Sequence, residues 1–151
     1  MIDGFFGFAQ AVVVADLDED GDLDVIGGSQ AAGIAWWENE TIHRSAAFGA
    51  GLEVASLGQA ARAIVADVDG DGDLDVVATG TSTLLWAENL GAGLGWTVRT
   101  LTTTLVIARG VAAGDIDADG DLDIVVTSAL SGEVLWFEND GSPTDGGWLS
   151  H

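Results

Sequence analysis

The sequence has no cysteine, a single proline and only four basic residues in 151. Without cysteine, disulfides and thiolate metal sites are excluded. Any cross-link that stabilises the fold must therefore come from ions bound by oxygen ligands or from oligomerisation. No apolar run reaches the about 20 residues that a membrane-spanning helix needs, and the N-terminus lacks the basic start of a signal peptide. The formal charge of −21 leaves almost no lysine or arginine for contact with phosphate groups. Neither nucleic acids nor membranes are therefore expected partners.

The residues that are abundant point to a folded chain that turns often. Hydrophobic residues make up 48% of the sequence, which excludes a disordered acidic tail. The 22 glycines indicate many turns between short strands rather than a helical bundle.

One acidic string of nine residues occurs three times, at 16–24, 67–75 and 115–123. The offsets between copies are 51 and 48 residues. An aromatic segment that ends in Glu-Asn follows each string, at 36–39, 86–89 and 136–139. The chain is therefore three copies of one unit.

Each unit predicts four short strands. A small apolar segment before each string (11–15, 63–66 and 111–114) is typical of a strand buried on both faces. β-Branched residues after the string predict a second strand, the aromatic segment a third and a more polar segment a fourth. Four strands in about 50 residues match the size of a propeller blade. A β-sandwich is the alternative, but it does not require threefold repetition.

The predicted fold is thus all-β, a β-propeller with three four-stranded blades in a single repeat domain over residues 1–151. The blades are expected at about 10–50, 61–103 and 109–151, with residues 1–9 as a segment that pairs with a neighbouring copy.

The acidic strings have the composition of a calcium site. Aspartates at positions 1, 3, 5 and 9 would repel one another unless a cation lay between them. Ca²⁺ takes six to eight oxygen ligands in irregular geometry, whereas Mg²⁺ requires a strict octahedron, and the strings contain no histidine or cysteine for zinc. An EF-hand is excluded because position 12 is Gly27, Ala78 or Val126 instead of glutamate, and strand-forming residues follow. A β-hairpin loop closed by position 9 remains.

We therefore predict three Ca²⁺ ions per chain, one in each string. Position 7 is expected to lend its backbone carbonyl, so its side chain is the weakest of the five aspartates as a ligand. Glycine at position 6 (Gly21, Gly72, Gly120) can take the positive φ of a tight reversal, and leucine at position 8 (Leu23, Leu74, Leu122) is expected to face the core. The alternative, three solvated acidic turns, does not explain the fixed pattern. The candidate metal residues are Asp16, Asp18, Asp20, Asp22, Asp24, Asp67, Asp69, Asp71, Asp73, Asp75, Asp115, Asp117, Asp119, Asp121 and Asp123.

The pattern D-x-D-x-D-G-x-x-D in all three strings, with the small apolar strand before it, resembles the FG-GAP/VCBS repeat family, which includes the calcium-binding blades of integrin α-subunit propellers. The resemblance implies the same aspartate ligands, calcium that stiffens each blade, and an extracellular or secreted location. It implies no catalysis. Because neither histidine is repeated and no nucleophile motif is present, the chain is not expected to be an enzyme.

Propellers of this family usually have about seven blades, whereas the chain has three, which leaves two sheet faces uncovered. Either the chain belongs to a longer tandem array, or copies join head to tail into a ring. The spacing from Trp96 to Asp115 is 19 residues, and the same spacing separates Trp148 from Asp16 of a following copy. We favour a homo-oligomer, with a six-bladed dimer ahead of a nine-bladed trimer.

A tryptophan recurs at one position in each unit, as Trp36, Trp86 and Trp136. Packing between neighbouring sheets is the favoured interpretation. The alternative is a lectin with aromatic pockets between blades, so a glycan or a protein ligand stays open as a further partner. Asn39, Asn89 and Asn139 are expected to satisfy backbone groups of the following turn.

Overall fold

The computed structural model describes residues 6–40, 48–91 and 95–151. It consists of three antiparallel sheets of four strands, and each sheet follows the order of the chain from its first strand to its fourth. We call the sheets blades 1, 2 and 3. Blade 1 contains β1 (Ala9–Ala15), β2 (Asp24–Ser29), β3 (Gly33–Trp37) and β4 (Leu52–Ala55); blade 2 contains β5 (Arg62–Ala66), β6 (Asp75–Thr79), β7 (Leu84–Asn89) and β8 (Trp96–Thr102); blade 3 contains β9 (Ala108–Gly114), β10 (Asp123–Ser128), β11 (Glu133–Glu138) and β12 (Leu149–Ser150).

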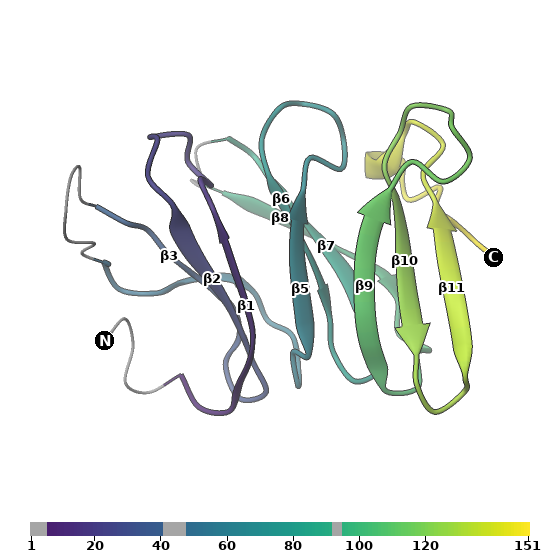
Figure 1. Cartoon of the computed structure of the whole chain (residues 1–151), viewed down its shortest axis with the longest axis horizontal. Helices are drawn as coiled ribbons and strands as arrows, with labels where there is room; N and C mark the ends of the chain where they lie inside the picture. The colour runs from purple at the N-terminus through teal and green to yellow at the C-terminus, as the bar shows by residue number, and fades with distance from the viewer. Residues whose placement is uncertain (1–5, 41–47, 92–94) are drawn as a thin grey trace.

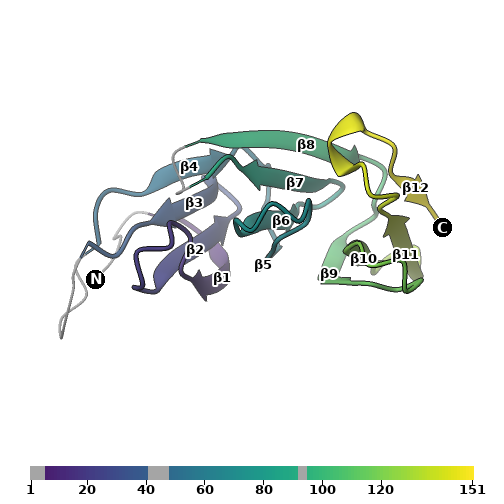
Figure 2. The same ribbon diagram turned by 90° about the horizontal axis from the view of Figure 1, so that it is seen from above.

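The blades stand side by side in an arc (Figures 1 and 2). The first strands β1, β5 and β9 are neighbours along its inner side, and the fourth strands lie along the outer side, where the blades spread apart (Figure 2). Alanine and glycine in the first strands allow this close approach. The predicted all-β fold of three four-stranded blades is confirmed, and within the described ranges no helix has the length and apolarity to cross a bilayer.

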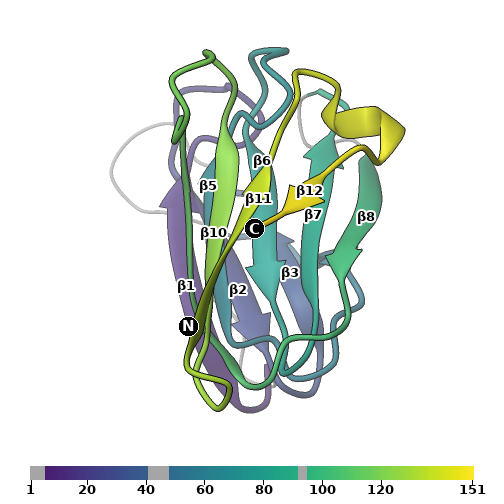
Figure 3. The ribbon, with the colours of Figure 1, turned by 90° about the vertical axis from the view of Figure 1, so that its right-hand side faces the viewer.

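Apolar residues on facing sheets form two cores, one at each blade–blade junction. Where blade 1 meets blade 2, Leu17 and Trp36 pack against Val76 and Leu85. Where blade 2 meets blade 3, the corresponding residues Val68 and Trp86 pack against Ile124 and Leu135. The three blades overlap face to face when the arc is seen from its end (Figure 3). Each blade thus contributes one face to the junction before it and the other to the junction after it.

Blade 1 departs from the sequence expectations on the face that no other blade covers. Val12 and Val14 of β1, expected to be buried, are exposed, and so is Leu23, expected to face the core. The corresponding Ala63, Val65 and Leu74 of blade 2 pack into the first junction core. The expectation was wrong for blade 1 because these positions lie on the face that in blade 2 packs against the blade before it, and no described blade packs on this face of blade 1.

Blade boundaries also differ slightly from those expected. β4 ends at Ala55, past the predicted end of the first blade near residue 50. Of the segment 1–9 predicted to pair with a neighbouring copy, residues 1–5 lie outside the described residues, and β1 already begins at Ala9.

Candidate metal centres

Each acidic loop connects the first two strands of a blade, and all three loops lie at the same edge of the arc (Figure 1). In each loop the aspartates at positions 1, 3 and 5 bring one carboxylate oxygen apiece within 4.8 Å of one another. The structure thus gathers nine of the 15 candidate residues into three triads. They are Asp16, Asp18 and Asp20; Asp67, Asp69 and Asp71; and Asp115, Asp117 and Asp119.

Local hydrogen bonds hold the triads in shape. In blade 1 the amide of Asp20 donates to Asp18 Oδ1 (3.3 Å), the amide of Asp22 donates to Asp20 Oδ1 (2.8 Å), and the amide of Gly21 donates to Asp16 Oδ2 (3.0 Å). Blade 2 repeats all three bonds. The glycine at position 6 has φ of 95°, 104° and 105° in the three loops, which confirms the predicted positive φ.

In blades 1 and 2 one oxygen of each triad is buried without a partner. Asp16 Oδ1 and Asp67 Oδ1 are shielded from solvent and make no hydrogen bond. A buried carboxylate oxygen without a donor costs free energy, and a divalent cation with a preference for oxygen ligands removes that cost. The triads could therefore hold a metal ion that prefers oxygen ligands.

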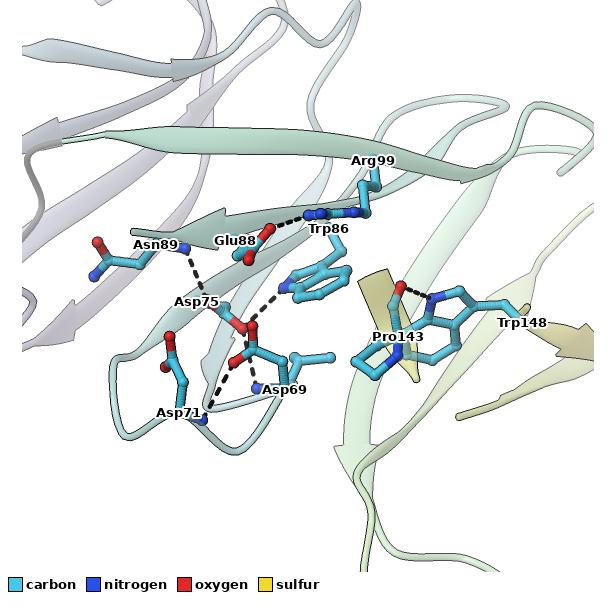
Figure 4. Close-up of polar contacts among 10 residues, drawn as sticks. Asp69, Asp71, Asp75, Trp86, Glu88, Asn89, Arg99, Pro143 and Trp148 are labelled. Carbon is cyan, nitrogen blue, oxygen red and sulfur yellow. Dashed lines mark hydrogen bonds and ion pairs between the residues drawn. The ribbon is translucent and has the colours of Figure 1, made fainter. Parts of the chain in front are cut away.

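The aspartate at position 9 lies outside the triads and holds backbone amides instead. Asp24, Asp75 and Asp123 are fully buried. In blade 2, Asp75 Oδ2 accepts hydrogen bonds from the Val68 amide (3.0 Å) and from Trp86 Nε1 (2.9 Å), and its Oδ1 accepts one from the Asn89 amide (2.8 Å) (Figure 4). Asp24 and Asp123 accept the two equivalent amide bonds in their own blades. The closing carboxylate therefore ties the loop to the end of the third strand.

Burial and neighbouring charge raise the pKa of carboxyl groups in the blade 2 loop. Burial raises the pKa of Asp75 to about 6, although its three hydrogen bonds act in the opposite direction. Burial, followed by the negative charge of Asp71, also raises the pKa of Asp69. Without a cation the ionised loop is therefore under electrostatic strain.

Position 7 contributes its backbone amide to the loop. Asp22, Asp73 and Asp121 each donate this amide to the position 5 carboxylate at 2.8 to 3.0 Å. Their side chains lie outside the triads.

Asn89 and Asn139, which follow the aromatic segments of blades 2 and 3, have a role that sequence reasoning missed. The expected turn contact is present, because Asn89 Oδ1 and Asn139 Oδ1 accept bonds from the amides two residues ahead. In addition, Asn89 Nδ2 donates across the blade junction to the Leu17 carbonyl, and Asn139 Nδ2 donates to the Val68 carbonyl (both 3.2 Å). Leu17 and Val68 occupy position 2, between two triad aspartates. Each such asparagine thus connects a blade to the acidic loop of the blade before it.

The third loop lacks this support. Position 2 is almost fully buried in the first two loops (Leu17 1% and Val68 2% exposed), whereas Ile116 is 48% exposed. All three aspartates of the third triad are exposed. Over the described part of the chain, the Gly120 amide makes no bond to Asp115 like those in the other two loops. In the described structure no blade covers this face of blade 3, whereas blades 2 and 3 cover the first two loops.

Two of the three recurrent tryptophans pack between blades, as favoured. Trp36 and Trp86 are buried in the two junction cores, so neither offers an open ring face to a sugar. Arg99 lies over the Trp86 ring, 4.9 Å from its centroid, and is ion-paired with Glu88 (Figure 4). Trp136, in the last blade, is half-buried and stacks on His151.

Comparison with known proteins agrees with this architecture. A lectin of Agrocybe aegerita, described as specifically recognising non-reducing terminal N-acetylglucosamine, superimposes with a TM-score of 0.62 at 25% identity over 93% of this chain and 37% of the lectin. The chain thus spans little more than a third of the length of that lectin. No curated protein matches the chain. The sequence profile of the FG-GAP-like repeat matches residues 16–78 and 67–126, so the chain belongs to the FG-GAP-like repeat family.

Proposed function

We propose that the chain is a calcium-binding β-propeller module that serves as a structural or interaction scaffold. The observation that carries the proposal is the buried, unpartnered oxygen of Asp16 and of Asp67, each within a triad of carboxylates. The family resemblance supports the same ion. The triad aspartates would supply the side-chain ligands, and Asp24, Asp75 and Asp123 would hold the loops closed around them.

Calcium would act here by neutralising charge. Each triad concentrates three carboxylates, and calcium that binds only the folded blade adds about 2.7 kcal/mol per site when free metal is a hundredfold above Kd. Because position 2 of the first two loops reaches into a blade junction, a stiffer loop also stiffens that junction. We expect a location rich in calcium, outside the cell, and assign no catalytic residue.

The test is thermal melting of the whole chain with chelator, with calcium and with magnesium at equal concentration. Calcium is expected to raise the melting temperature strongly, and magnesium much less. Asp71→Asn removes one triad carboxylate and should reduce the calcium effect, whereas Asp140→Asn, an exposed aspartate outside the loops, should leave it unchanged. Equal melting in chelator and in calcium would refute the proposal.

Glycan binding is the second candidate function, supported by a groove at the junction of blades 2 and 3. The groove has a volume of about 250 Å³. Its walls offer an indole ring, a guanidinium, a carboxylate and hydroxyls, the groups with which proteins bind sugars, and the structurally similar lectin recognises a sugar. The lining residues are Arg99, Thr100, Leu101, Thr144, Asp145, Gly146 and Trp148.

Titration with N-acetylglucosamine and a glycan array would test this candidate. Asp145→Ala should abolish any binding, and Asp140→Ala, outside the groove, should not. A folded protein that binds no glycan would remove the candidate and leave the calcium proposal intact.

A further inference from the structure

We propose that the two outer faces of the arc bind each other in different copies of the chain, so that blade 1 of one copy covers blade 3 of the next and completes its acidic loop. The calcium dependence of this contact rests on the proposed calcium role; the contact itself rests on the repeated design of the blade junctions.

The outer face of blade 3 repeats the residues that close the two internal junctions. Leu17, Ile26, Ile34 and Trp36 of blade 1 are buried against blade 2. Strand pairing places Ile116, Val125, Val134 and Trp136 at the same positions of blade 3. There they meet no blade, and Val134 is 67% exposed where its counterpart Ile34 is fully buried.

The outer face of blade 1 repeats the complementary residues. Ala63, Val65 and Leu74 are the blade 2 residues that receive blade 1. Val12, Val14 and Leu23 stand at these positions in blade 1, and all three are exposed, Val12 at 72%. Each outer face therefore carries residues of the junction half that the other lacks. On blade 1, Phe6 packs edge-on against Trp37 of this face and leaves Val12, Val14 and Leu23 exposed.

The proposed contact would also complete the third acidic loop, in addition to burying apolar surface. In blades 1 and 2 the following blade buries position 2 of the loop, and an asparagine of that blade holds the position 2 carbonyl. No described blade covers the third loop, and its triad is exposed. A second copy would bury Ile116 and give the third triad the surroundings of the first two.

A second copy is favoured over a partner of other chemistry because both halves of the junction are present on one chain. The contact is heterologous, so repetition closes a ring or extends a chain of copies. Two copies contribute six blades, within the four to eight typical of propellers, and three copies contribute nine. Each chain has a charge of −21, which opposes association, and bound calcium reduces that repulsion.

The experiment is native mass spectrometry and sedimentation of the whole chain, in calcium and in chelator, with three variants. Val12→Glu places a carboxylate on the face of blade 1, and Val134→Glu places one on the face of blade 3. Leu130→Glu is the matched control, an equally exposed apolar residue in the hairpin between β10 and β11. All three side chains are exposed in the single chain, so each variant is expected to fold, which circular dichroism would verify.

We expect the unaltered chain and Leu130→Glu to form closed oligomers in calcium and to dissociate in chelator. Val12→Glu and Val134→Glu should each be monomeric, because a buried unpaired carboxylate weakens association by at least about a hundredfold. Mixed together, they should form a heterodimer through their two intact faces. This rescue distinguishes the head-to-tail contact from a symmetrical one.

Three outcomes would overturn the inference. They are a monomeric unaltered chain in calcium, oligomers that survive both face variants, and a mixture of the variants that stays monomeric. The two proposals fail separately. A monomer that binds calcium and melts higher with it refutes the assembly alone, whereas head-to-tail oligomers that are indifferent to calcium and chelator refute the calcium role alone.

Discussion

Replacement of Asn139 by alanine should loosen the junction between blades 2 and 3. The substitution removes three hydrogen bonds of a buried side chain: from Nδ2 to the Val68 carbonyl (3.2 Å), from Nδ2 to the Leu122 carbonyl (3.3 Å), and from the Gly141 amide to Oδ1 (3.1 Å). At about 1 kcal/mol net for each bond, the free energy of unfolding should fall by about 3 kcal/mol. For a chain of this size the melting temperature should drop by about 6 to 12 °C.

The assay is chemical and thermal unfolding in chelator, where calcium does not contribute. Asp140→Ala is the matched control, because Asp140 is the next residue, is exposed and accepts one local hydrogen bond. Its cost should stay below about 1 kcal/mol. If Asn139→Ala costs no more than this control, Asn139 does not connect the blades as argued.

Calcium adds a second measurement to the same variant. The carbonyl that Asn139 holds belongs to Val68, between the triad residues Asp67 and Asp69. Stabilisation by calcium should therefore be smaller in Asn139→Ala than in the unaltered chain. A double-mutant cycle with Asp71→Asn should show coupling in calcium and little coupling in chelator. Equal coupling in both conditions would contradict a link through the metal.

Two further changes test the loops. Gly72→Ala should destabilise the protein by about 1 kcal/mol or more, because φ is 104° there, while Gly58→Ala, without positive φ and with open space around it, should be nearly neutral by the same unfolding measurement. Because the pKa of Asp75 is raised to about 6, the folded state binds a proton more readily than the unfolded state. Metal-free protein should therefore melt higher as the pH falls from about 7 to about 5, and calcium-loaded protein should melt lower, since calcium requires ionised ligands. If the melting temperatures of the metal-free and the calcium-loaded protein changed in the same direction with pH, this reasoning would be contradicted.

The fold could be predicted from the sequence because it is repeated and local. Each blade consists of consecutive strands joined by short turns, so strand order follows chain order, and a period of about 50 residues identifies the unit. The positive φ of Gly21, Gly72 and Gly120 could be predicted for the same reason, since a nine-residue reversal restricts its own backbone.

Within the loops, the sequence pattern treated positions 1, 3, 5 and 9 alike, and the structure separates them. Positions 1, 3 and 5 form the triad, whereas the position 9 aspartate turns inward to hold the amides of position 2 and of the asparagine beyond the third strand. The partners of Asp75 lie up to 14 residues away. No local spacing rule reports such a contact.

The sequence by itself determined the repeat, the strands and the acidic loops, because these depend on neighbours along the chain. Tertiary structure alone decided which copies of a position are buried. Leu17, Val68 and Ile116 are equivalent in sequence, yet only the first two are covered by the blade that follows in the structure. Leu23 is exposed because no described blade covers the opposite face, on blade 1. Burial of a residue depends on whether a neighbouring blade packs against its face, and this is decided by the position of its blade within the arc.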